Sequence, residues 1–208
     1  AASDVYKRQV SAMISIGVEE GVFQMKENKM IQNLIKLDKV KSQSIMTPRT
    51  VVATAPESMS LKEFYQDGKY KFYSRIPIYN DSEDYITGYV LRQTVLEKLA
   101  EDRFDMCLKD VARPILSFPE NSSVSTVWEQ MLEKKEHISI LIDEYGCFWG
   151  IVTMEDIIET ALGFEIVDEK DSVTDMQKLA RDKWQKKLAE TKIRKVCHNA
   201  VLSQFSSS

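Results

Sequence analysis

The chain has 208 residues, 43% of them hydrophobic, with a formal net charge of −4 and a pI near 5.4. This composition suits one large or two small hydrophobic cores. It argues against a general nucleic-acid binder, which would carry a basic face. No stretch approaches the roughly 18 to 20 consecutive apolar residues of a membrane-spanning helix. We therefore expect a soluble chain, although such a chain can be one part of a longer membrane protein.

The two ends and the segments next to them read differently from the middle of the chain. The end segments "AASDVYKRQ" and "VLSQFSSS" show no apolar period, so we treat both as tag-like residues. Apolar residues near helical spacing over 17–40 predict a charged amphipathic helix or a helix pair. Residues 173–196 predict a second helical segment, whose interleaved acids favour a solvated face over a membrane surface.

An internal repeat organises the middle of the chain. The stretch "APESMSLKEFYQ" (55–66) aligns with "FPENSSVSTVWEQ" (118–130). Further on, "SRIPIYNDSEDYITGYVL" aligns with "HISILIDEYGCFWGIVT", and Gly88 is then paired with Gly150. Such self-similarity indicates two copies of one supersecondary unit, each too small to be comfortably stable alone. We expect the two copies to pack together and bury both apolar faces.

Each copy reads as β-α-β-β-α, which predicts an α+β fold. A short β-rich run precedes a Pro-Glu turn, a helix with apolar residues at helical spacing follows, and then come two β-rich runs and a closing helix. The predicted strands are 51–54, 75–79 and 85–91 in the first copy, and 115–118, 137–142 and 147–153 in the second. The closing helices are predicted at 92–101 and 154–162.

Three motifs carry a family resemblance. They are "IMTPRT" (45–50), "YSRIPIY" (73–79) and "GIVTMEDIIETALGFEIVDE" (150–169), and "EEGVF…ENKMIQNLIKL" precedes them. The chain resembles a CBS-domain pair, or Bateman module, of the CorC / hemolysin C-like / CNNM family linked to magnesium and cobalt efflux. The resemblance implies tandem CBS domains at 45–105 and 106–166. Tag-like residues and juxtamembrane-type helices then occupy 1–44, and a helical tail occupies 167–208.

The resemblance also implies a location and partners. Family members usually carry an N-terminal transmembrane domain, so this chain would be the regulatory piece at the cytoplasmic face of the cell membrane. CBS modules commonly pair through their closing helices into homodimers. We therefore expect a homodimer, an attached transmembrane domain, an adenine nucleotide as ligand and no nucleic-acid partner.

The pattern around Gly150, Thr153 and Asp156 is suited to a nucleotide. Glycine allows close backbone approach, and a threonine hydroxyl beside free helix-start amides suits a phosphate. A carboxylate one turn into the helix can accept hydrogen bonds from both ribose hydroxyls. Taken alone, however, these residues fit a plain helix N-cap with first-turn acids at least as well. The repeat and the other two motifs favour the binding interpretation.

By the family pattern, the rest of the site comes from the first copy. The implied residues are Thr47, Ser74, Arg75, Ile76 and Pro77. The apolar pair Ile76 and Pro77 suits an adenine face. For Arg75 the alternatives are a phosphate contact and a surface ion pair. Arg49 is a weaker phosphate candidate, for which a solvent-exposed role fits equally well.

The first copy departs from the motif, because Leu91 and Thr94 stand where the second copy has Thr153 and Asp156. We therefore expect one nucleotide site per chain. The resemblance favours ATP over AMP or ADP, with Mg²⁺ carried by the nucleotide phosphates rather than by a dedicated protein site.

An enzyme is the weakest reading, because the chain has two histidines and no hydrolase, P-loop or Rossmann motif. We expect His137 to be a partly buried structural residue, and Asp143 with Glu144 to form a turn. The alternative function is a structural dimerisation module with a vestigial nucleotide groove. We also expect Asp156→Ala to abolish ATP binding and leave the fold intact, on the premise that the residue faces solvent.

Overall fold

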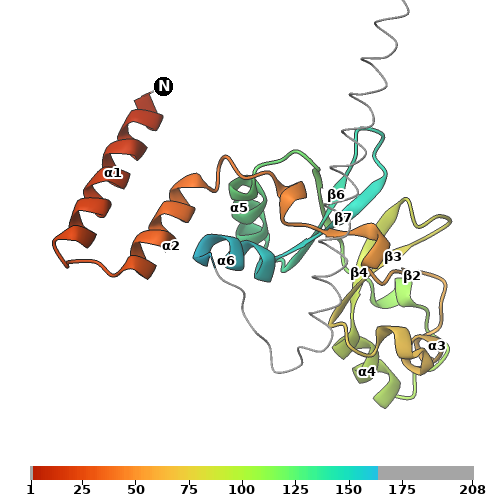
Figure 1. The fold of residues 1–208 in the computed structure, drawn as a ribbon. Coiled ribbons are helices and arrows are strands. Elements are labelled where there is room, and N and C mark those ends of the chain that lie inside the picture. The colour runs from red at the N-terminus through yellow and green to blue at the C-terminus, as the bar shows by residue number, and fades with distance from the viewer. Residues whose placement is uncertain (1, 164–208) are drawn as a thin grey trace, which may run out of the picture. The chain divides into compact units, whose positions relative to one another are not determined.

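The computed structural model describes residues 2–163, which belong to one compact unit (Figure 1). The predicted helix at 173–196 and the C-terminal end lie outside the described residues. None of the described helices is both long and apolar enough to cross a membrane.

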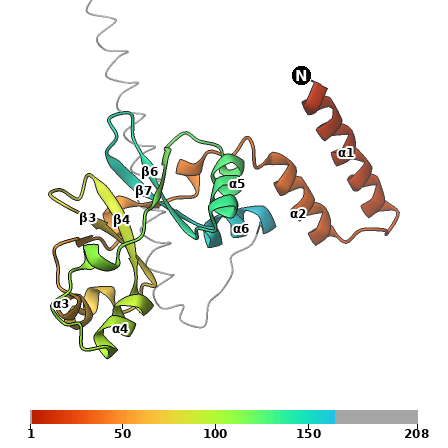
Figure 2. The same ribbon diagram turned by 180° about the vertical axis from the view of Figure 1, so that it is seen from behind.

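Two helices precede the repeat, and the second of them lies within 17–40, where a helix or a helix pair was predicted. They are α1 (Ala2–Glu19) and α2 (Met25–Lys36), and α2 lies between α1 and the last described helix in both views (Figure 1, Figure 2). Helix α1 includes residues 2–9, although the lack of an apolar period there predicted tag-like residues. Lys7 in this helix forms a 2.7 Å ion pair with Asp38. Among the apolar residues near helical spacing over 17–40, Leu37 is the one that is buried.

Both copies of the repeat have the predicted β-α-β-β-α order. The first copy contains β2 (Ala55–Pro56), α3 (Leu61–Gln66), β3 (Arg75–Tyr79), β4 (Ile86–Leu91) and α4 (Arg92–Ala100). The second contains β5 (Leu116–Pro119), α5 (Val124–Lys134), β6 (Ile138–Ile142), β7 (Phe148–Thr153) and α6 (Met154–Leu162). The strand predicted at 51–54 was wrong, because a 3₁₀ turn occupies Arg49–Val51 and the strand follows at Ala55.

The strands form two sheets. The first copy builds the three-stranded sheet β2-β3-β4, and the second builds β7-β6-β5 with β1 (Thr47–Pro48) added at the edge. In each sheet a parallel pair, β2–β3 or β5–β6, is followed by an antiparallel hairpin, β3–β4 or β6–β7.

The segment that precedes each copy packs on the other copy. Residues 41–48 precede the first copy, yet Lys41 and Ser42 bond to residues 122–123 and β1 pairs with β7. Residues 106–113 precede the second copy, yet Cys107 bridges Ser60 and Arg113 bridges Tyr89. This exchange ties the two sheets together through backbone hydrogen bonds on both sides.

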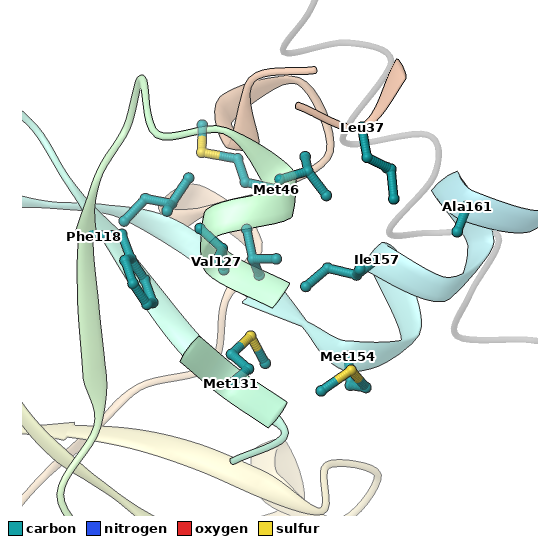
Figure 3. Packing of buried hydrophobic residues seen from close by; sticks show 11 residues of the cluster. Leu37, Met46, Phe118, Val127, Met131, Met154, Ile157 and Ala161 are labelled. Atoms are coloured by element: carbon teal, nitrogen blue, oxygen red, sulfur yellow. The ribbon is translucent and has the colours of Figure 1, made fainter. Parts of the chain in front are cut away.

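Each copy has its own hydrophobic core, and the exchanged segments contribute to both. The core of the second copy includes Leu37 and Met46 from before the repeat, packed with Val127, Met131 and Ile157 (Figure 3). The core of the first copy includes Leu108 from the connecting segment. Burial of one such large side chain stabilises the fold by about 1.5 to 3 kcal/mol. The exchange therefore contributes to the stability of both copies.

Gly150 tests the pairing of β1 with β7. A Cβ built there would lie 2.5 Å from the Thr47 carbonyl oxygen, a backbone atom that cannot move aside without opening the strand pair. We expect Gly150→Ala to lower the free energy of unfolding by about 1 to 3 kcal/mol, the usual cost of overpacking. Chemical denaturation measures it. Gly68→Ala is the control, because nothing lies within 4 Å of its built Cβ. Equal effects for the two variants would contradict the close approach.

Candidate functional site

Thr153 and Asp156 face each other where β7 ends and α6 begins. The Asp156 carboxylate oxygen Oδ2 accepts hydrogen bonds from the Thr153 hydroxyl at 2.7 Å and from the Thr153 amide at 2.9 Å. In return, the Asp156 amide donates to the Thr153 hydroxyl at 3.3 Å. This reciprocal capping box satisfies helix-start donors and fixes the orientation of both side chains. The N-cap that the sequence left as an alternative is therefore present.

Asp156 does not lie on an open, solvent-facing surface. The residue is buried, with 8% of its surface exposed, whereas its neighbour Glu155 is exposed. The premise that it faces solvent was wrong, because its carboxylate is buried and forms the N3 half of the capping box with the N-cap Thr153. Loss of this half of the box costs about 0.5 to 2 kcal/mol.

Thr47 lies beside the same strand. In the β1–β7 pair its Cα is opposite Ile151, and Pro48 is opposite Gly150. Side chains alternate along a strand, so Ile151 and Thr153 lie on one face of the sheet, with Thr47 across from Ile151 on that side. Thr47 is itself buried. The structure thus brings Thr47 to the face that carries the Thr153–Asp156 pair.

The segment "SRIP" divides between two faces of the other sheet. Ile76 is fully buried in the core of the first copy, so its side chain is directed away from any ligand at the opposite face, and the expected adenine contact through that side chain was wrong. Arg75 and Pro77 alternate with it and lie on the face away from the core. Ser74 is exposed just before β3, and its carbonyl accepts the amide of Arg92 at the start of α4.

The two sheet faces that carry these residues meet. Ile138 and Ile140 alternate with the core residues of β6, and they are buried although neither hydrophobic core includes them. Tyr89 in β4 is likewise buried and outside both hydrophobic cores. Its hydroxyl donates a 2.6 Å hydrogen bond to Glu136, just before β6. The faces with Arg75 and Pro77 on one sheet and Thr47 and Thr153 on the other are therefore directed toward each other.

A second polar contact joins the copies at the hairpin ends. The Arg49 guanidinium pairs with the Asp84 carboxylate at 2.7 Å and donates to the Phe148 carbonyl at 3.2 Å. The Phe148 amide donates to the Asp84 carbonyl at 2.7 Å. The Arg49 hydrogen bond lowers the pKa of Asp84, and Ser82 adds to this effect. Sequence reasoning missed this role, because nothing in the motif identifies Asp84 as a partner.

Other expected features have clear outcomes. Asp143 forms the predicted turn, in which its carboxylate accepts the amides of Tyr145 and Cys147 at 2.9 Å each. His137 is exposed rather than partly buried, because it stands before β6 begins. Among the residues that the structure describes, no group of three or more His, Cys, Asp or Glu side chains could hold a metal ion.

The first copy lacks the polar pair at the corresponding place. Leu91 precedes α4 and makes no side-chain cap, whereas Thr153 caps α6. Thr94 stands one turn into α4, where the second copy has Asp156.

The comparisons with known proteins agree with this architecture. The CBS domain family matches residues 108–163. A CBS domain of the bacterial CNNM/CorC family Mg²⁺ transporter has a TM-score of 0.73 and 27% identity, with 77% of this chain and 98% of that chain covered. Residues 108–163 thus form a CBS domain, and the chain resembles CBS domains of the CorC/CNNM type.

Two further relatives bear on function. "Magnesium and cobalt efflux protein CorC" of Buchnera aphidicola is 28% identical over 79% of this chain and 58% of its own length. The CBS domain of the CNNM/CorC family transporter in complex with ATP is 29% identical, with a TM-score of 0.63 over 67% of this chain and 99% of that one. The chain spans about half the length of the curated relatives it matches.

The Arg49–Asp84 pair gives a test of the hairpin contact. Arg49→Ala removes the first cause of the lowered Asp84 pKa, so we expect that pKa to rise toward its ordinary value in carboxyl-detected NMR titration. A carboxylate with a lowered folded-state pKa stabilises the fold above its ordinary pKa of about 3.9, and this stabilisation is lost as the pH falls through the lowered value. The variant should therefore differ most from the parent at neutral pH and least in acid.

Lys98→Ala is the control for this titration, since Lys98 forms an ion pair with Glu101 in the first copy instead. It should raise the pKa of Glu101 and leave that of Asp84 unchanged. An Asp84 titration that is identical in the parent and in Arg49→Ala would show that the pair does not form.

Proposed function

We propose that this chain is the regulatory CBS pair of a CorC/CNNM-type membrane protein that handles divalent cations, and that it binds one adenine nucleotide, Mg-ATP. The observation that carries the proposal is the Thr153–Asp156 pair on a buried face directed toward Arg75 and Pro77 of the other copy. The likeness to a CBS domain in complex with ATP supports the choice of nucleotide.

Each residue has a role in this proposal. The Asp156 carboxylate accepts the ribose hydroxyls, which is compatible with its capping role because a carboxylate can accept about four hydrogen bonds. Thr153 and the first amides of α6 contact phosphate. Thr47 adds a hydroxyl from β1, Pro77 covers the adenine, and Arg75 contacts the phosphates. Mg²⁺ arrives with the phosphate oxygens and retains several waters.

The regulatory step follows from the position of the site between the two copies. A nucleotide that contacts both sheets favours the arrangement in which they are drawn together, and it shifts the population only by its difference in affinity between the arrangements. Two chains pair through α4 and α6, and α1 and α2 transmit the change toward an attached transmembrane domain. The module then works at the cytoplasmic face of the membrane, with no chemistry on the nucleotide.

Nucleotide-dependent stability separates this proposal from a dimerisation module with a vestigial site. At an ATP concentration about 100 times its dissociation constant, with Mg²⁺ present, we expect the free energy of unfolding to rise by about 2.7 kcal/mol. Calorimetric titration supplies the dissociation constant and thermal or chemical unfolding supplies the stability. The absence of any shift with ATP, ADP or AMP would instead favour the dimerisation module.

Asp156 gives the residue-level test. Asp156→Ala should raise the dissociation constant for Mg-ATP by about a hundredfold or more, because two hydrogen bonds to a charged group contribute about 1.5 to 3 kcal/mol each. The variant also loses the carboxylate half of the capping box, so Asp156→Asn serves beside it, since the amide oxygen can still accept the Thr153 amide. Calorimetric titration gives the affinities, and unfolding gives the fraction folded.

Glu155→Ala is the matched control, because it removes an exposed acid from the adjacent position of the same helix turn. Its ATP affinity should stay near that of the parent. Parent-like affinity in Asp156→Ala itself would locate the nucleotide elsewhere in the protein.

A further inference from the structure

The first copy has a place that corresponds to the proposed nucleotide site, and the strand registers define it. Tyr89 pairs with Pro77 as Ile151 pairs with Ile140. Arg113 takes the place of Thr47, because a Cβ built on Gly88 would lie 2.6 Å from the Arg113 carbonyl oxygen, much as one on Gly150 meets Thr47. The residues that stand at the corresponding places are therefore tyrosine and arginine instead of isoleucine and threonine.

Tyr89 is strongly held at this place. It is buried, with 2% of its surface exposed, and its hydroxyl donates the 2.6 Å hydrogen bond to Glu136 of the other copy. Its amide donates to the Arg113 carbonyl at 3.0 Å, and its own carbonyl accepts the Arg113 amide at 2.8 Å. The tyrosine thus spans the interface from β4 to the segment before β6.

Tyr89 is also connected to the proposed site. Its Cα is opposite Pro77, and Arg75 lies two residues from Pro77 on the same face of β3. Burial raises the pKa of the Tyr89 phenol and the hydrogen bond to Glu136 adds to it, while the positive charges of Arg113 and Arg75 oppose the shift. Arg75 thus lies on the same face of the sheet as Tyr89, on the neighbouring strand.

We propose that Tyr89 is a positioning residue for the nucleotide site, and that its hydrogen bond to Glu136 holds the β3–β4 face with Arg75 and Pro77 against the second copy. This inference rests on the proposed function. The bond lies near Leu91 and Thr94, where the first copy has no equivalent of the Thr153–Asp156 pair. It keeps one side of the interface closed in the absence of nucleotide, so the ligand meets a face that is already aligned.

The test is calorimetric titration of the whole chain with Mg-ATP. Tyr89→Phe keeps the buried ring and removes the hydroxyl, and Glu136→Ala removes its acceptor. Each should raise the dissociation constant for Mg-ATP about threefold to tenfold, the range that the net loss of one hydrogen bond produces. The double variant should bind no more weakly than either single variant, because both remove the same bond. The controls are Tyr145→Phe and Glu133→Ala, which change exposed residues of the second copy.

The outcomes separate this inference from the function on which it rests. A parent chain that binds no adenine nucleotide would overturn both. If the parent binds Mg-ATP and the variants bind it with unchanged affinity, the positioning role alone is overturned. This holds even if the variants unfold at a lower temperature, because lower stability with unchanged affinity indicates a purely structural role. Additive losses in the double variant would also overturn it, since they would show that the two side chains act separately.

Discussion

The pairing of β1 with β7 is the constraint on which the rest of the structure depends. A two-residue strand from before the first copy completes the sheet of the second, and the approach is close enough that only glycine fits at position 150. This contact brings Thr47 to the edge of β7, and the next residues lead to Arg49 and its ion pair with Asp84. One short strand therefore positions a candidate ligand side chain and joins the two hairpins.

At the start of α6, too, the same residues serve both the fold and the candidate site. The Thr153–Asp156 pair was ambiguous as a sequence, because a helix cap and a ribose-phosphate site call for the same residue types at the same spacing. The structure has the cap, and the cap does not exclude the ligand. Reciprocal bonds lock the rotamers of both side chains before any nucleotide arrives, which lowers the conformational entropy that binding must overcome.

Much of the fold could be predicted from the sequence, because the relevant signals are local. Strand alternation, helical spacing and the repeat located all but one of the strands of the two copies and both closing helices. The exchange of opening segments could not be predicted, since it depends on contacts between residues such as Lys41 and Ser123 that no local pattern links. The missed first strand has a similar cause, because the chain after Pro48 turns to follow β7 before it enters its own sheet.

The sequence predicted the residues of the candidate site better than it predicted the sheet face on which each side chain lies. The motif placed Thr153 and Asp156 in the second copy, but it grouped Thr47 with the first copy, whereas β1 pairs with β7 of the second. It also assigned Ile76 to the ligand, although strand alternation sends that side chain into the core. Period-two alternation within β3 was the signal that could have corrected it, because it places Ile76 on the same face as the apolar Ile78. The partner of Arg49 carried no such signal, because Asp84 lies in a polar hairpin loop where acids are common.

The two copies differ in how they satisfy the interface, and the difference has a functional consequence. At the place where the second copy presents a hydroxyl and a carboxylate, the first presents Leu91 and Thr94, and nearby Tyr89 reaches across to Glu136. A polar contact made within the chain is present at all times, whereas one made through a ligand depends on its concentration. An interface with one contact of each kind can change at one side while the other stays fixed. In the proposed function, such asymmetry would let a single nucleotide alter the angle between the two sheets without separating them.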